Sequence, residues 1–267
     1  MSIRFTILGC GSSPGVPRIG GDWGACDPKN PKNRRKRCCL LVEKNGEHGT
    51  TRIVIDTGPD FREQCLSSDL SWADAILYTH SHADHVHGID DLRAFVINRR
   101  KRVQIYANGS TLKRLHEGFG YCFETPAGSS YPPILEANEI SHGNLISIDG
   151  PGGPIEILPF DQIHGDITSL GFRISTLAYS SDISALPDSS RELLGGLSHW
   201  IVDALRYRPH PSHFSLSEAV EEINYVKPET ALLTHMHIDL DFETVSEETP
   251  DNIHPAYDGM VIDIKVP

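Results

Sequence analysis

The 267-residue sequence contains no apolar run of the roughly 18–20 residues that a membrane-spanning helix needs. Residues 1–5 also lack the long apolar core of a secretory signal peptide. We therefore expect a soluble, cytoplasmic protein that has no membrane partner.

Cysteine is scarce as well, with six residues in the whole chain. A domain of this size can bury a large core and does not need a disulfide framework, so we expect the thiols to be reduced. Cys38 and Cys39 stand at the start of an apolar stretch, which favours packing in the core over chemistry.

Basic residues are outnumbered by acidic ones, 24 to 36, and the formal net charge is −12. This balance disfavours a general nucleic-acid-binding surface, and no stable nucleic-acid partner is expected. Two basic runs nevertheless occur at residues 32–37 and 99–102. Each is either a solvated face or a place where an anionic substrate is attracted to an otherwise acidic protein.

The sequence also has no internal repeat and no linker that would argue for two domains, so we expect one α/β domain over residues 1–267. Apolar patterns predict strands at 3–8, 38–42, 51–55, 75–78, 103–107, 155–160, 170–174, 177–180, 197–202 and 230–234. Helical spacing predicts helices at 60–66, 87–95, 110–119 and 215–226.

Three connections are less regular. The second and third strands are expected to form a hairpin around the polar turn at 45–46. Residues 18–37 are predicted to be an irregular insertion. Residues 120–150 are rich in Gly and Pro and could form a lid or an inter-subunit arm. The glycine-rich loop 9–17 lacks the lysine and the spacing of a phosphate-binding loop, which favours a structural turn.

The most informative stretch is 75–85, where an apolar run ends in three histidines and an aspartate. His80 and His82 are two positions apart, so on an extended backbone they point to the same side. Asp84 and His85 follow the strand end, where a turn can bring them to a second point nearby. Because imidazole and carboxylate are ligands of zinc, manganese and iron at hydrolytic sites, the stretch predicts a metal site.

The Thr-His-x-His-x-Asp-His run at 79–85 resembles the signature of the metallo-β-lactamase-fold hydrolases. That resemblance implies a four-layer αββα sandwich and two divalent metal ions, zinc or manganese, with iron possible. In that family the first two histidines, here His80 and His82, bind one metal ion, and the Asp-His pair, here Asp84 and His85, binds the other.

The same resemblance implies three further ligands and one supporting carboxylate. His164, at a strand end, fits the first metal ion, whereas His142 is a competitor that lacks the sequence following the family's histidine. Asp182, in a Ser-Asp pair, corresponds to the bridging carboxylate, and His235, in Leu-Thr-His, to the last ligand of the second ion. Asp56 corresponds to the aspartate that orients a ligand histidine from behind.

The implied chemistry is hydrolysis by a hydroxide held between two metal ions, with Asp84 and Asp182 taking part as ligands. A phosphodiester substrate fits best; penicillin cleavage has no sequence support. His213 stands just before a helix for which Ser215 is a candidate N-cap. The phosphodiesterase branch has a histidine in a comparable place that acts as general acid and phosphate ligand, so His213 is a predicted catalytic residue.

Within that branch the sequence resembles the PhnP-like enzymes over most of its length, including the closing residues 257–260. The resemblance implies a metal-dependent phosphodiesterase for a small cyclic or nucleotide-like phosphodiester, such as a phosphoribosyl cyclic phosphate, and a possible homodimer. Two alternatives are a tRNA 3′-end endonuclease of the tRNase Z type and a non-catalytic nucleotide-binding protein. Because residues 18–37 hold only Cys26, and His237 follows His235 by two positions where the PhnP pattern has three, the separate structural zinc site of PhnP is not expected.

Overall fold

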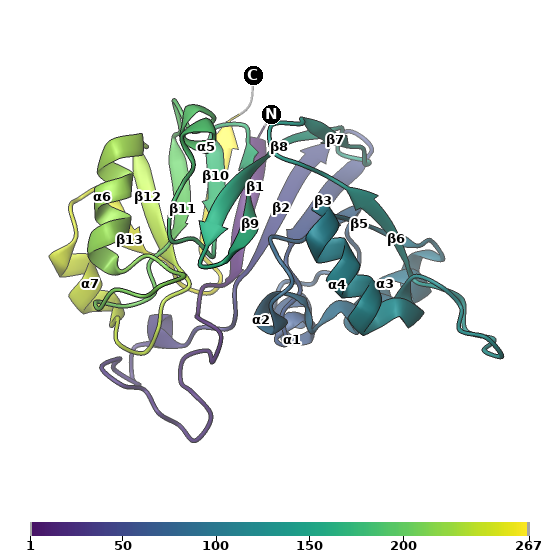
Figure 1. Cartoon of the computed structure of the whole chain (residues 1–267), viewed down its shortest axis with the longest axis horizontal. Helices are drawn as coiled ribbons and strands as arrows, with labels where there is room; N and C mark the ends of the chain where they lie inside the picture. Colours follow the sequence, from purple (N-terminus) through teal and green to yellow (C-terminus); the bar gives the residue numbers. More distant parts are fainter. Residues whose placement is uncertain (1, 266–267) are drawn as a thin grey trace.

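Two seven-stranded sheets lie face to face, with helices on both outer sides (Figure 1), in a computed structural model that describes residues 2–265. The four layers confirm the predicted αββα sandwich. The first sheet has the order β14 (Val261–Lys265), β1 (Ser2–Gly9), β2 (Cys39–Gly46), β3 (Gly49–Ile55), β4 (Ala75–Leu77), β5 (Val103–Ala107) and β6 (Leu135–Glu139). The second has the order β13 (Ile253–Pro255), β12 (Thr230–Thr234), β11 (His199–Asp203), β10 (Leu177–Ser180), β9 (Ile167–Ile174), β8 (Ile155–His164) and β7 (Ile146–Ile148).

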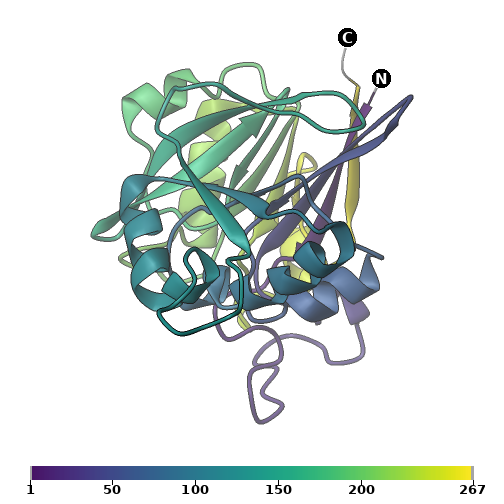
Figure 2. The same cartoon turned by 90° about the vertical axis from the view of Figure 1, so that its right-hand side faces the viewer.

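The helices divide between the two sides of the sandwich, as the view turned by 90° also shows (Figure 2). On the side of the first sheet lie α1 (Phe61–Ser67), α2 (Ala83–Val86), α3 (Arg93–Arg99) and α4 (Gly109–Phe119). On the side of the second lie α5 (Asp188–Glu192), α6 (Leu216–Val226) and α7 (Phe242–Glu248). Among the described residues, no helix is both long and apolar enough to cross a membrane.

The central strands are apolar where both of their faces are covered, as in the second half of β3. In β3, Ile53 and Ile55 point into the core between the sheets, whereas Val54 points to the opposite face and packs with Phe61 of α1. All three strand residues are fully buried. Alternation therefore places every second side chain in the central core and the others beneath the helices.

Parallel strands occur in both sheets, and this arrangement determines where the polar loops meet. β3, β4 and β5 are parallel in the first sheet, and β10, β11 and β12 are parallel in the second. Their carboxyl ends lie at the lower edge of the sandwich in Figure 1, opposite the chain termini. The loops that follow these strands therefore converge at one edge, where ligands bind in many α/β proteins.

Several predicted boundaries were wrong. The β2–β3 ladder continues to the Gly46–Gly49 pair, so the hairpin turns at residues 47–48 and not at 45–46; cross-strand polar pairs, such as Glu43 with Arg52, extend it. The helix predicted at 87–95 is divided between a 3-10 turn (Ile89–Leu92) and α3.

Residues 120–150, whose role the sequence left open between a lid and an inter-subunit arm, contain an edge strand of each sheet, β6 and β7. β6 exposes most of its side chains, so it lacks the apolar pattern on which strand prediction depends. α5, α7, β13 and β14 were also not predicted. The N-cap at Ser215 was correct, since its hydroxyl accepts a hydrogen bond from the backbone N–H of Glu218 in a full capping box.

Asp258, near the C-terminus, links the glycine-rich loop 9–17 to the insertion. Its carboxylate accepts hydrogen bonds from the backbone N–H groups of Cys10, at 3.2 Å, and Lys36, at 2.8 Å. Burial raises the pKa of Asp258 to about 6, although these bonds act in the opposite direction. A carboxyl whose pKa is raised by folding stabilises the fold fully below its unfolded pKa, and that stability is lost as the pH rises through the folded pKa.

We expect Asp258→Asn, which fixes a neutral side chain, to gain stability relative to the wild type as the pH rises from 4 to 7. The free energy of unfolding of the variant minus that of the wild type should rise by up to about 3 kcal/mol. Folding raises the pKa of Asp258 from 3.8 to about 6, and one pKa unit corresponds to about 1.4 kcal/mol. Urea unfolding at several pH values measures it. Asp263→Asn is the control, because Asp263 is exposed and a hydrogen bond from Arg4 lowers its pKa, so it stays ionised over this pH range and its stability difference should change little. A pH-independent difference for Asp258→Asn would contradict this account.

Candidate metal centre

The lower edge of the sandwich gathers all seven predicted metal ligands. Each side chain comes from a strand end or from the segment that follows one: after β4, at the end of β8, after β10 and after β12. Six of the seven are at most 9% exposed; only His82 is exposed to solvent. They form two groups that share one residue, Asp182.

The first group consists of His80, His82, His164 and Asp182. Asp182 Oδ2 lies 3.7 Å from the Nε2 atoms of both His80 and His164. His164 Nε2 is also 3.2 Å from His82 Nδ1. The Nδ1–H of His164 donates to the carbonyl of Ser212 at 2.6 Å, so its Nε2 is free to face the group.

The second group consists of Asp84, His85, Asp182 and His235. Asp182 Oδ1 lies 3.0 Å from His85 Nε2 and 3.5 Å from His235 Nε2. Asp84 Oδ2 lies 3.4 Å and 3.5 Å from the same two nitrogens. Asp182 thus turns one carboxylate oxygen toward each group, which is the arrangement expected of a carboxylate between two cations.

The residues present fit divalent cations. Four buried atoms that face the two groups lack a hydrogen-bond partner within the described chain: His80 Nε2, His85 Nε2, His235 Nε2 and Asp182 Oδ1. Buried polar atoms are rarely left without a partner, since this costs free energy. A donor set of imidazole nitrogens and carboxylate oxygens is typical of zinc, manganese and iron sites.

The carboxylates of both groups are held in the ionised form. Burial acts to raise the pKa of Asp182, but the charges of His235 and His85 keep it well below its usual range. Burial also opposes ionisation of Asp84, yet contacts with His85 and His235 lower its pKa overall. His164 behaves differently, since burial lowers its pKa to about 4 and favours the neutral imidazole that a metal requires.

Asp56 lies behind both ligand groups. The resemblance implied this role, a carboxylate that orients a ligand histidine. Asp56 accepts hydrogen bonds from His85 Nδ1 at 2.7 Å and from the backbone and hydroxyl of Thr79 at 2.9 Å each. The Thr79 hydroxyl in turn lies 3.0 Å from His80 Nδ1. One fully buried carboxylate therefore orients a histidine of each group so that Nε2 points inward.

Two of these residues have strained backbones. Asp56 has φ of +65° and His235 has φ of +57°, in the left-handed region that residues with a Cβ rarely adopt. Such strain persists only where the surrounding structure enforces it, and it is concentrated at functional sites. Both residues directly follow parallel strands, so the turn bends each side chain back toward the groups.

His213 and Asp203 form a third group with His235. The Nδ1–H of His213 donates to Asp203 Oδ2 at 2.6 Å, and His213 Nε2 lies 3.9 Å from Asp182 Oδ2. Asp203 is fully buried, and burial raises its pKa well above the usual range. Asp203 was not recognised from the sequence, where it is an isolated aspartate. Its place at the end of an apolar strand, like that of Asp56, could have indicated it.

The loop 9–17 is more than the structural turn predicted from the sequence, because it reaches the candidate metal centre. Ser13 Oγ donates to Asp84 Oδ2 at 2.7 Å, a contact that the sequence gave no means to predict. The backbone of the loop pairs with Met236, beside His235. The alternative ligand His142 is not part of any of the three groups; its Nδ1 accepts a hydrogen bond from the backbone of Asp161.

Cys26, the single cysteine of residues 18–37, is packed against protein groups. Its thiol donates to the carbonyls of Ile238 and Leu240, at 3.4 Å each. Arg35, only 2% exposed, places Nη1 3.9 Å from Cys26 Sγ, and its Nη2 donates to Asn33. A buried guanidinium therefore occupies the neighbourhood of this thiol.

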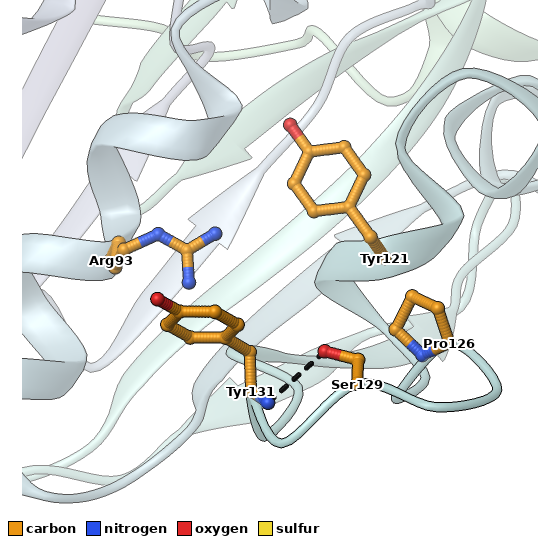
Figure 3. A pocket seen from close by; sticks show the side chains of 5 residues that line it. All are labelled: Arg93, Tyr121, Pro126, Ser129 and Tyr131. Carbon is orange, nitrogen blue, oxygen red and sulfur yellow. Dashed lines mark hydrogen bonds between the residues drawn. The ribbon is translucent and has the colours of Figure 1, made fainter.

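A separate cavity of about 320 Å³ lies between α3 and the loop that precedes β6 (Figure 3). The side chain of Arg93 extends between Tyr121 and Tyr131, and the backbone of Tyr131 donates to Ser129 at 3.1 Å. Among the described residues that line it, none is a histidine, a cysteine or a carboxylate. These described lining residues therefore lack the imidazole and carboxylate groups that the candidate metal centre gathers.

Comparisons with known proteins identify the superfamily. Residues 51–236 match the family model of the beta-lactamase superfamily domain. The crystal structure of a diphosphatase from the PhnP family is similar with a TM-score of 0.88 and 36% identity, over 99% of this chain and 98% of that one.

Two curated relatives match a smaller share of their own length. An octanoyltransferase from Porphyromonas gingivalis is 31% identical over 270 residues, 98% of this chain and 52% of that protein. A ribonuclease Z from Methanopyrus kandleri is 27% identical over 164 residues, 60% of this chain and 50% of that protein. The chain thus spans about half the length of these relatives.

Proposed function

Because the chain belongs to the beta-lactamase superfamily and, within it, to the PhnP family, we propose that it is a dinuclear metal-dependent phosphodiesterase. Its substrate is a small cyclic or nucleotide-like phosphodiester. The observation that carries the proposal is the position of Asp182, whose two carboxylate oxygens face two separate histidine groups at 3.0 to 3.7 Å.

The ligands divide between two cations. His80, His82 and His164 would hold the first, Asp84, His85 and His235 the second, and Asp182 would bridge them. Two divalent cations bound there would activate a water molecule and stabilise the charge on the phosphoryl and leaving oxygens. The protein fixes this arrangement in advance, because Asp56 and the Ser212 carbonyl orient the imidazole rings.

His213 is the proposed proton donor to the leaving oxygen. Its Nδ1–H is bound to Asp203, so Nε2 is the atom that faces Asp182 and the substrate position. The ring also stacks on His235, with centroids 4.7 Å apart, which restricts its rotation. A positioned histidine can therefore transfer a proton to an alkoxide as the phosphoester bond breaks.

A second candidate is a tRNA 3′-end endonuclease, favoured by the match to ribonuclease Z from Methanopyrus kandleri. The net charge of −12 argues against it, because affinity for RNA depends mainly on cationic contacts with phosphates. Octanoyl transfer is not proposed, since 48% of that relative lies outside the match. The full set of ligands also argues against a purely nucleotide-binding protein.

The test is a substrate screen with protein loaded in turn with zinc, manganese and iron. We expect turnover of bis(p-nitrophenyl) phosphate and of small cyclic or nucleotide diesters, and its loss on chelation. Cleavage of a precursor tRNA without turnover of any small diester would favour the endonuclease instead. Metal binding without turnover of any substrate would favour the nucleotide-binding alternative.

A further inference from the structure

A hollow of about 430 Å³ adjoins the candidate metal centre and is bordered by two arginines. Its lining includes Ser13, Arg18, Ile19, Arg37 and Asp84. Asp84 belongs to the second ligand group, and Ser13 is hydrogen-bonded to it, so the hollow opens directly beside the metal centre. We propose that this hollow, the Arg18–Arg37 site, binds a second phosphate of the substrate, an inference that rests on the proposed function.

Arg18 is held in place by a chain of side chains. Its Nη2 contacts His237 Nε2, and His237 Nδ1 lies 3.3 Å from Asp239 Oδ2. The backbone of residues 18–22 is closed by hydrogen bonds of Arg18 with Asp22 and Gly21. His237 is not a member of any of the three ligand groups. Through its contact with Arg18 it acts as a positioning residue for that side chain.

Arg37 comes from the basic run 32–37. Its Nε lies 3.0 Å from Asp60 Oδ2 without a well-directed hydrogen bond, and the side chain is 24% exposed. Asp22 faces Arg18 more distantly, at 3.8 Å. Ion pairs at solvent-accessible positions are weak, so both guanidinium groups keep donors for an anion.

The other basic residues of the run 32–37 contact groups outside the hollow. Lys32 lies over the ring of Phe242, Arg34 over the ring of Trp23, and Arg35 is buried beside Cys26. The backbone of Lys36 is bound to Asp258. Only Arg37 of this run lines the hollow.

Two guanidinium groups beside a metal centre select for adjacent phosphates. Arginine binds phosphate through directed, charge-assisted hydrogen bonds, which lysine cannot form with the same geometry. In a protein of net charge −12, such a local positive region also attracts anions toward the site. A phosphate held at the metal centre would place its neighbour in the Arg18–Arg37 site, so nucleoside diphosphate derivatives are the substrate class this geometry favours.

The experiment measures the affinities of AMP and ADP for the metal-loaded protein by calorimetry, because the two ligands differ by one phosphate. We expect the wild type to bind ADP at least about 10-fold more tightly than AMP. Arg18→Gln and Arg37→Gln should each reduce this ratio toward one. Arg114→Gln is the matched control, since it removes the same charge from an exposed position on α4, and it should leave the ratio unchanged.

His237 is tested by two substitutions. His237→Ala should lower the ADP to AMP ratio, and His237→Gln, which restores an acceptor for Arg18, should recover it; a merely structural loss would not be recovered. An equal affinity for AMP and ADP in the wild type, or a ratio kept in both arginine variants, would overturn the inference. Because binding requires no turnover, this failure is distinct from a failure to hydrolyse phosphodiesters.

Discussion

Asp182→Ala is expected to lower the metal-dependent turnover of bis(p-nitrophenyl) phosphate by a factor on the order of 10³ or more. Asp182 is the only one of the seven proposed ligands shared by both groups, so its removal takes an oxygen from each cation position. It also leaves His80, His85 and His235 without the carboxylate they surround. The expected result is a loss of both metal content and kcat.

The measurement combines kcat/KM with elemental analysis of the purified variant. Asp251→Ala, at an exposed position before β13, is the control and should retain full turnover and metal content. Asp182→Asn keeps the shape of the side chain and removes its charge, so it separates the electrostatic effect from packing. Wild-type turnover in Asp182→Ala would exclude Asp182 as a bridging ligand.

His213→Ala is expected to lower kcat by a factor of about 10² to 10⁴ when the leaving group is an alkoxide, as in a 2′,3′-cyclic nucleotide. The loss should be much smaller with bis(p-nitrophenyl) phosphate, because p-nitrophenolate is a stable anion that leaves without a proton. The atom that would supply the proton is His213 Nε2, which lies 3.9 Å from Asp182 Oδ2.

Asp203→Asn tests how His213 is oriented. The Oδ1 of asparagine can still accept the Nδ1–H that Asp203 accepts at 2.6 Å, but the amide carries no negative charge to stabilise a protonated His213. We therefore expect a smaller loss of kcat than in His213→Ala, with the same dependence on the leaving group. An equal loss on both substrates would indicate that His213 serves as a ligand or as packing and not as a proton donor.

The part of the site that is predictable from the sequence is the part in which ligands adjoin one another or follow a recognisable strand. His80, His82, Asp84 and His85 lie within six positions after an apolar run, and the structure brings them together. His235 follows the predicted strand β12, whose parallel pairing with β11 brings it to the same edge as the loop after β10. His164 ends β8, which is antiparallel to β9, and the ligand groups place it at that edge as well.

The remaining features depend on contacts between segments that carry no local pattern. Asp203 gains its role only from His213 and His235, which come from other loops. Ser13 reaches Asp84 because the loop 9–17 pairs with Met236, which no short-range pattern reveals. The edge strand β6 was not predicted because an exposed strand has little apolar alternation.

The central claim is that the two ligand groups hold two cations that act together on a phosphodiester. The most direct test is to remove all metal with a chelator and then to titrate manganese or zinc back while following hydrolysis of bis(p-nitrophenyl) phosphate. We expect no turnover in the metal-free protein and a rise that saturates at about two equivalents per chain. Full turnover without metal, or saturation at a single equivalent, would contradict the account.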